Sequence, residues 1–175
     1  QVRLAFEQAD LGDAVRTAVN DAAARAAERR VTIETDLPGA LPTWLDPAEF
    51  ARALSAVLDN AVRFSPEGGT VQVRARQSEQ DIELTVTDQG QGIDPSFLPQ
   101  VFDELADGDI LHHSQGQGLS LALTRQIILA HRGSIEVASA KEVGTIITIR
   151  LPSGPASEEP ALVGASADPE ASQQF

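Results

Sequence analysis

An aspartate followed by two glycines ends a strand-like stretch of the sequence, "TVTDQGQGI" at residues 85–93. The alternation of apolar and polar residues before it predicts a strand with one face in the core. A carboxylate at the end of such a strand, that of Asp88, can accept a hydrogen bond from an exocyclic amine such as that of adenine. Gly90 and Gly92 carry no side chains, so a flat ring can lie against the backbone beside the carboxylate. A plain turn explains the same residues, because Asp and Gly are common in turns.

A second glycine-rich turn, with Gly116 and Gly118, precedes a helix that is predicted to begin near Leu119. Free amide groups at a helix N-terminus, together with its partial positive charge, favour phosphate. A flexible hinge is the alternative, since a single Gly-x-Gly is weak evidence for a ligand.

The segment "DPAEFARALSAVLDNAVRFSP" (46–66) is predicted to be an amphipathic helix, with a capping box at its start. Ala56, Asn60 and Arg63 form a second stripe along its flank. The amide oxygen of Asn60 can ligate Mg²⁺, which prefers oxygen ligands, and Arg63 can hold a phosphate. Alternatively, both are polar residues in the last, fraying turn of a helix.

These three segments must be positioned by the rest of one domain, and the sequence predicts an α+β fold: a two-layer α/β sandwich with three main helices on one face of a sheet of about five strands, mixed but mainly antiparallel. The predicted elements are a strand in 4–11, a helix from Asp10 to about Arg30, a strand in 31–37, a short extended piece at 41–45, the helix that Pro66 stops, strands in 70–77 and 81–88, a short helix in 95–101, a helix in 119–131 with Gly133 as its C-cap, and strands in 133–140 and 144–152. The domain is expected to span 1–152, followed by a disordered acidic tail at 153–175.

Composition narrows the function classes. The chain of 175 residues has a net charge of −13, which argues against a nucleic-acid partner. It has no cysteine, so thiolate metal sites are excluded, and no apolar run long enough to cross a membrane, so the chain is expected not to be membrane-inserted. It opens on Gln1, and we expect it to be a fragment of a longer protein, cytoplasmic or the cytoplasmic part of a membrane-anchored sensor.

Taken together and in order, the motifs resemble the ATP-binding catalytic domain of two-component sensor histidine kinases, in the superfamily that includes gyrase, the heat-shock chaperone and the mismatch-repair ATPase. The resemblance rests on "ALSAVLDNAVRFSPEGG" (N box), "VTDQGQGI" (G1 box), "VFDELADGD" (F box), "GQGLSLALTRQIILAHRGSIEVAS" (G2 box) and the closing strand "GTIITIRLP". It implies a Bergerat-type ATP-binding fold and a nucleotide site. The residues of that site would be Asn60, Arg63, Phe64, Asp88, Gly90, Gly92, Ile93, Gly116, Gln117, Gly118, Leu119 and Thr145, with Asn60 as the metal ligand.

The resemblance further implies that the chain binds ATP with Mg²⁺ and donates the γ-phosphoryl group to a histidine on a separate dimerisation and phosphoacceptor hairpin, with a response regulator downstream and a dimeric full-length protein. No acceptor motif occurs here, so no catalytic residue is identified: His112 and His113 lie in the predicted lid, and His131 ends a helix. The acceptor hairpin is therefore expected on other sequence, and the chain alone is expected to be inactive in transfer.

Four positions depart from the family pattern. The first N-box residue is Ala56, where hydrolysing relatives have a Glu that activates water. Leu105 replaces an aromatic, the lid at 106–115 has no Lys or Arg, and Ser120 replaces a glycine. Two other functions remain open: a degenerate nucleotide-binding regulatory module, which Ala56 and the unusual lid favour, and a serine kinase of the anti-sigma type, which has the same fold.

Overall fold

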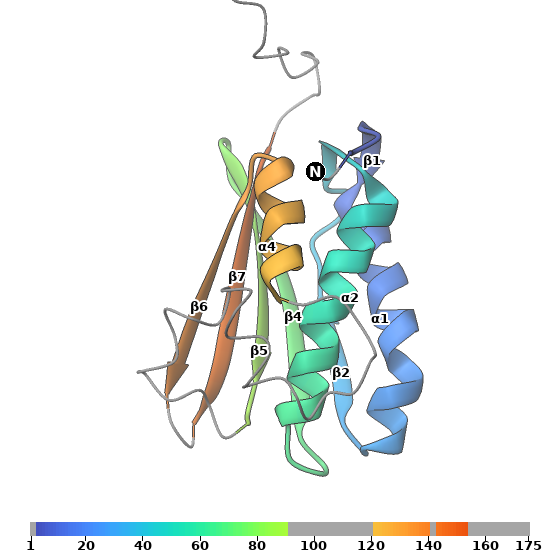
Figure 1. Ribbon diagram of the computed structural model, residues 1–175, viewed down its shortest axis with the longest axis vertical. Helices are drawn as coiled ribbons and strands as arrows, with labels where there is room; N and C mark the ends of the chain where they lie inside the picture. Colours follow the sequence, from blue (N-terminus) through green and yellow to red (C-terminus); the bar gives the residue numbers. More distant parts are fainter. Residues whose placement is uncertain (1–2, 91–120, 141–142, 154–175) are drawn as a thin grey trace, which may run out of the picture.

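The computed structural model describes residues 3–90, 121–140 and 143–153, and these form two layers. Its elements are β1 (Glu7–Asp10), α1 (Leu11–Glu28), β2 (Thr32–Asp36), β3 (Pro42–Leu45), α2 (Pro47–Phe64), β4 (Thr70–Gln77), β5 (Asp81–Asp88), α4 (Leu121–Ala130), β6 (Ser134–Ala140) and β7 (Gly144–Pro152). The three helices lie side by side on one face of the main sheet (Figure 1). The predicted α+β two-layer fold is confirmed. The predicted helix at 95–101 lies outside the described residues, as does the predicted tail from residue 154 onward.

The main sheet has five strands in the order β2-β4-β5-β7-β6, of which only β2 and β4 run parallel. The predicted hairpin is present with the predicted bounds, and Gln77 pairs with Ile82 next to the turn. β5 and β7 pair along their whole length, so that Asp88 lies opposite Thr145. The sequence did not predict that β1 and β3 leave the main sheet and form a separate antiparallel pair.

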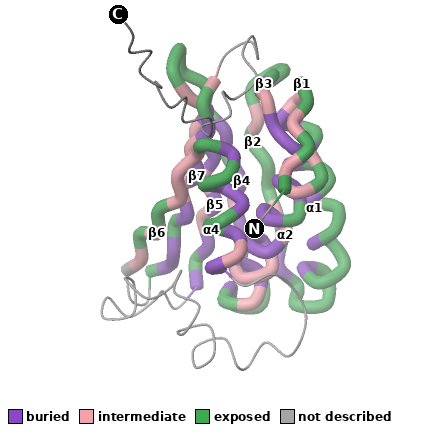
Figure 2. Tube along the Cα trace, turned by 45° about the horizontal axis from the view of Figure 1, so that its top comes forward, coloured by how far each residue is buried: buried purple, intermediate pink, exposed green. Residues whose placement is uncertain are grey.

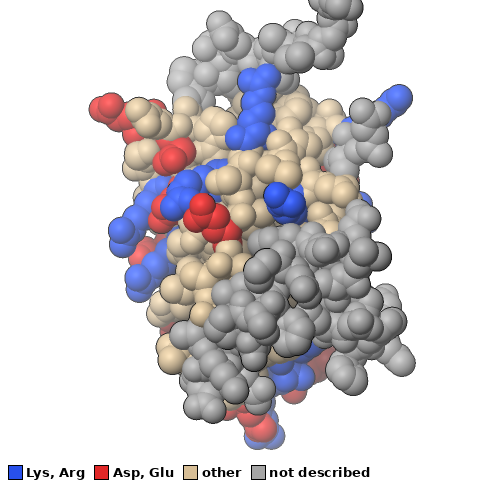
Figure 3. All heavy atoms as spheres, turned by 60° about the vertical axis from the view of Figure 1, so that its left-hand side comes forward, with Lys and Arg blue, Asp and Glu red and all other residues tan. Residues whose placement is uncertain are grey.

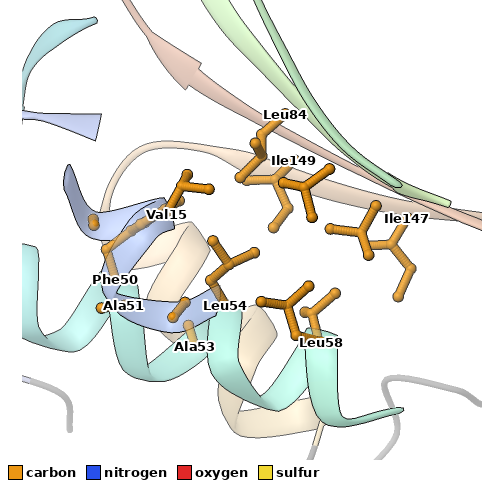
Figure 4. Close-up of a cluster of buried hydrophobic side chains, with 14 of the residues drawn as sticks. Val15, Phe50, Ala51, Ala53, Leu54, Leu58, Leu84, Ile147 and Ile149 are labelled. Carbon is orange, nitrogen blue, oxygen red and sulfur yellow. The ribbon is translucent and has the colours of Figure 1, made fainter. Parts of the chain in front are cut away.

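The core lies between the helical layer and the sheet. The buried side of each helix faces the sheet, and the outer sides are exposed (Figure 2). The close-up in Figure 4 labels Val15 of α1, Phe50, Ala51, Ala53, Leu54 and Leu58 of α2, Leu84 of β5, and Ile147 and Ile149 of β7. α2 has contacts with α1, α4, β4 and β5, so its orientation is fixed from several sides. None of the three helices described has the length and apolar content needed to cross a membrane.

The N-terminal end of α2 is tied to α4 and to the start of the chain. The carboxylate of Asp46 accepts hydrogen bonds from Glu49 N (3.0 Å) and Ala5 N (2.7 Å), as expected for an N-cap. The predicted capping box is only half formed, because the backbone N–H of Asp46 donates to Nε2 of His131 (3.1 Å) instead of to Glu49. His131 is buried, and its Nδ1 lies 2.7 Å from Ile127 O. The imidazole therefore joins two helix ends that are distant in sequence.

The C-cap prediction for α4 was wrong in its detail. The residue with left-handed backbone is Arg132 (φ 60°), and Gly133 N donates to Ile128 O over 3.0 Å. Gly133 is needed for another reason: a Cβ there would overlap with the carbonyl oxygen of Arg150 on β7. The glycine thus allows close packing against the sheet rather than an unusual backbone angle.

The face of the sheet turned away from the helices carries charges of both signs, which are visible together in Figure 3. Arg150 lies 3.2 Å from both Glu83 and Glu136 on the two neighbouring strands. Arg74 lies 4.0 Å from Asp36 on β2. Such exposed ion pairs contribute little to stability. The exposure of these charged side chains shows that this side of the sheet faces solvent.

Candidate nucleotide site

The C-terminal end of α2 places three of the predicted site residues. The apolar stripe of α2 is buried against the sheet, which leaves its flank for polar side chains. Asn60 and Arg63 on that flank are half-buried, and Phe64 in the last position is 46% exposed. An exposed phenylalanine beside half-buried polar groups is a combination that a ligand with an apolar and a charged part can use.

The carboxyl group of Asp88 is held by two backbone amides at the end of β5. Its Oδ1 accepts hydrogen bonds from Gly90 N (2.9 Å) and from Thr145 N (3.3 Å). No described residue donates to Oδ2. Asp88 is only 8% exposed, so the strand, the following turn and β7 fix its direction. One oxygen is therefore engaged by the protein, while the other is left without a donor from the described residues.

Burial raises the pKa of Asp88 above the ordinary value for an aspartate, and the hydrogen bonds from Gly90 and Thr145 lower it by a smaller amount. The ionised carboxylate is thus disfavoured by its surroundings, although not excluded. A donor that approached Oδ2 would stabilise the ionised form, because hydrogen bonds to a charged acceptor are the stronger kind.

Gly90 brings the end of β5 against the end of α2. A Cβ built at Gly90 would overlap with the carbonyl oxygen of Phe64, so any side chain here would separate the two elements. The structure therefore brings Phe64, Gly90, Asp88 and Thr145 together at one end of the two layers, and the resemblance had implied one nucleotide site for these four residues. Arg63 precedes Phe64 in the same turn.

Two residues near Asp88 were missed by the sequence analysis. Gly144 has a φ of 137°, and a Cβ there would overlap with the carbonyl oxygen of Asp88. Ser139 on β6 lies 3.0 Å from Thr145, hydroxyl to hydroxyl, and donates to Gly144 O over 3.1 Å. A glycine at the first position of a strand was a signal for Gly144, whereas nothing in the sequence indicated Ser139.

The other predicted site residues lie outside the described residues, namely Gly92, Ile93, Gly116, Gln117, Gly118 and Leu119. The same is true of the departures from the family pattern at Leu105, 106–115 and Ser120. Ala56 is described: it is buried, and its methyl group is all that this position presents.

Asn60 is the residue for which the sequence analysis predicted metal ligation, and it lies in the described part of the chain. In that part, no three His, Cys, Asp or Glu side chains lie close enough to hold a metal ion together. A magnesium ion would therefore need one amide oxygen, phosphate oxygens and water, which is an ordinary arrangement for a magnesium–nucleotide complex. The half-buried position of Asn60, beside Arg63, fits such a role.

A groove of about 1300 Å³ lies elsewhere, between α1 and α2. It is lined by small and charged side chains from both helices, including Ala14, Ser55, Ala56 and Asp59, and it includes neither Asn60 nor Asp88. At its edge Arg25 donates to Asp59 over 2.5 Å. Burial raises the pKa of Asp59, and Arg25 opposes that shift. The groove is thus separate from the predicted nucleotide site.

Known proteins are similar to this chain in sequence and in fold. Residues 45–155 match the family described as histidine kinase-, DNA gyrase B- and HSP90-like ATPase. The chain is 33% identical over 120 residues to the adaptive-response sensory kinase SasA of Synechococcus elongatus, which covers 67% of this chain and 31% of SasA. It is 37% identical over 109 residues to the sensor histidine kinase CusS of Escherichia coli, covering 61% of this chain and 22% of CusS. The chain thus spans less than a third of these two relatives.

A solved structure, the mycobacterial sensor histidine kinase MprB, superposes with a TM-score of 0.74 at 31% identity and covers 86% of this chain and 99% of that chain. A second, the Acinetobacter baumannii histidine kinase AdeS, superposes with a TM-score of 0.69 at 26% identity and covers 89% of this chain and 71% of that chain. The match to the family extends over most of the chain, and the likeness to MprB includes the whole fold. The chain belongs to the histidine kinase-, DNA gyrase B- and HSP90-like ATPase family, as an ATP-binding catalytic domain of the sensor histidine kinase type.

Proposed function

We propose that this domain binds ATP with Mg²⁺ where β5 and α2 end, and that it donates the γ-phosphoryl group to a histidine on a separate helical hairpin. The observation that carries the proposal is the carboxyl group of Asp88, with one oxygen held by two backbone amides and no described donor at the other. The adenine amine would donate to that second oxygen. The glycine at position 90 leaves room for the flat base beside it.

The phosphate side of the site would be formed by α2. Arg63 would contact phosphate oxygens, Phe64 would cover the sugar, and Asn60 would give its amide oxygen to the metal. Thr145 would approach the base from β7, and Gly92, Ile93 and residues 116–119 would complete the site. Magnesium, when bound, supplies charge neutralisation on the phosphates, and the protein contributes mainly by positioning the reactants.

The phosphoacceptor would come from sequence outside this chain. Among the residues that the structure describes, His131 is the one histidine. It is 3% exposed, and both of its ring nitrogens are in hydrogen-bonding contact within the fold. It is therefore unsuitable as an acceptor. The sensor-kinase relatives are much longer than the matched region, which leaves room for a hairpin in proteins of this kind. A response regulator would take the phosphoryl group next, and the full protein would act as a dimer, in the cytoplasm where ATP is available.

ATP hydrolysis to water is expected to be slow. The position at which hydrolysing relatives place a glutamate is occupied by Ala56, which has no group that can accept a proton from water. Binding without rapid turnover suits a domain that must keep ATP until an acceptor histidine approaches.

Radiolabelled ATP tests the proposal in three samples: the chain alone, the chain with a sensor-kinase hairpin, and the Asn60→Ala variant with the same hairpin. We expect acid-labile label on the hairpin in the second sample only. Acid-stable label on the lone chain would indicate a serine or threonine acceptor and contradict the proposal. Binding of ATP without transfer in any sample, using a hairpin from a close relative, would instead indicate a regulatory module.

A further inference from the structure

The last turn of α2 carries Arg63 and Phe64, and its carbonyl groups lack partners within the helix, as in every α-helix. The last four carbonyl groups of α2 are those of residues 61 to 64, and the first two of them accept hydrogen bonds from the next residue, Ser65. Ser65 N lies 3.1 Å from Ala61 O and 3.3 Å from Val62 O, and Ser65 Oγ donates to Ala61 O over 2.7 Å. The carbonyl group of Arg63 receives its donor from another part of the fold.

Arg29, at the C-terminal end of α1, reaches across to this turn. Its Nη2 donates to Arg63 O over 2.8 Å, and its Nε donates to Val62 O over 3.3 Å. The planar guanidinium thus contacts two successive carbonyl oxygens, a geometry that a lysine ammonium cannot reproduce in full. Its positive charge also lies at the negative end of the α2 dipole, where a cation is favoured.

Gly90, which follows β5, lies against the same turn of α2. The carbonyl group of Phe64 packs directly against Gly90, whose N–H donates to the carboxylate of Asp88. Arg29 therefore holds the last turn of α2 through the carbonyl groups of Val62 and Arg63. The carbonyl group of Phe64 lies against the turn that follows Asp88. A shift of this turn would move Arg63 and Phe64 relative to Asp88.

We propose that Arg29 is a positioning residue of the nucleotide site: it holds the last turn of α2 so that Arg63 and Phe64 face the same ligand as Asp88. This inference rests on the proposed function. It assigns Arg29 no contact with the ligand, because its hydrogen bonds are made to the backbone of α2. Its effect should be greatest on the part of the ligand that α2 contacts, which is the phosphate and sugar side.

The adjacent Arg30 provides a matched control. It has the same side chain, yet it forms an ion pair with Glu67 (2.8 Å) in which the two side chains are 79% and 68% exposed. An exposed pair of this kind contributes little. Methionine at either position keeps an unbranched but shorter side chain and removes the charge and all donors.

The experiment measures the dissociation constants of Mg-ATP and of adenosine for the wild type, Arg29→Met, Arg29→Lys and Arg30→Met, by titration of amide chemical shifts, with thermal unfolding of each variant. We expect Arg29→Met to weaken Mg-ATP about tenfold, the effect of losing a hydrogen bond from a charged donor. Adenosine, which lacks phosphates, should weaken by no more than about twofold, since Asp88 still accepts from its amine. Arg29→Lys should recover part of the loss, and Arg30→Met should match the wild type.

Two results would overturn the positioning role. One is equal Mg-ATP affinity in Arg29→Met and Arg30→Met. The other is an equal loss of Mg-ATP and adenosine affinity with a lower unfolding temperature and no recovery by lysine, which would make Arg29 a purely structural residue. If the wild type binds neither ligand, the proposed function itself is refuted. The titration of the wild type therefore distinguishes this outcome from the two results above.

Discussion

The two ends of α2 differ in how their polar groups are used. At the N-terminal end, Asp46 and His131 satisfy one another and their neighbours, with the rings of Phe6 and Phe50 edge-on to the imidazole at 5.4 and 5.8 Å. At the C-terminal end, the Asn60 side chain makes no hydrogen bond to a described residue, and Phe64 is exposed. A saturated junction gives stability, whereas unsatisfied groups at a surface give recognition. The two ends of α2 thus differ in their task. The N-terminal end, here called the closed end, stabilises the fold, and the C-terminal end, here called the open end, presents groups that a ligand can bind.

The largest expected effect tests the closed end. His131→Ala removes a buried ring, its edge contacts and the acceptor for Asp46 N, and should lower the free energy of unfolding by about 3 kcal/mol. Chemical denaturation measures it. The control is Leu129→Ala near the end of α4, two residues before His131, where the side chain is 49% exposed and the loss should stay below about 1 kcal/mol. If the two variants lose equal stability, the junction is not the stabilising feature inferred here.

The next effect tests the open end. Asp88→Asn keeps the size of the side chain and an oxygen for Gly90 and Thr145, but turns an amide N–H₂ toward the ligand. Mg-ATP affinity should fall about 100-fold, while the free energy of unfolding at neutral pH stays equal or rises. Calorimetry of ligand binding and denaturation of the free domain give the two values. Asp36→Asn, at a side chain that is 80% exposed, should change neither.

The sequence was sufficient to predict the sandwich, the hairpin and the closing strand, because alternation in β4 and β5, and less strictly in β7, indicates both the strand bounds and the buried face. It also indicated that Asp88, Gly90 and Phe64 belong together, through motif order. These features depend on short-range patterns that one sequence displays directly.

Long-range polar contacts were not predictable in the same way. The sequence suggested that Glu49 would complete the cap at Asp46, but the partner of that amide is His131, 85 residues away. Arg29 looked like one of two consecutive arginines at a helix end, and only the packing of α1 on α2 shows that it contacts carbonyl groups 33 and 34 residues further along the chain. Such partners are set by tertiary packing, which local propensity does not encode.

A smaller effect concerns the contact between the two elements at the open end. Gly90→Ala places a methyl group against the carbonyl oxygen of Phe64, so the backbone must shift, at a cost of about 2 kcal/mol in the free energy of unfolding. Nucleotide affinity should fall with it, since Phe64 and Asp88 move apart. Gly39→Ala is the control, because no atom lies within 4 Å of a Cβ at that position. Denaturation and binding of both variants would show whether this contact matters, and an unaltered Gly90→Ala would contradict the inferred close approach.

The smallest effect is a pH dependence that arises at the open end. Burial raises the pKa of Asp88, so its ionised form is less favourable in the folded protein than in the unfolded chain. The stabilising contribution of this group is therefore present below the unfolded pKa and is lost as pH rises through the folded pKa. Asp88→Asn, which never ionises, should gain stability relative to the wild type as pH rises through that range, and the raised pKa of Asp59 cancels because both proteins contain it.

Nucleotide binding should change in the opposite sense, because the amine is best accepted by the carboxylate: wild-type affinity should decline as pH falls through the raised pKa, starting at a higher pH than for an ordinary aspartate. Denaturation and calorimetry across this range measure the two slopes. Parallel stability curves for wild type and variant would show that Asp88 titrates like an exposed aspartate, and that its carboxyl group is more solvated than the 8% exposure of the residue indicates.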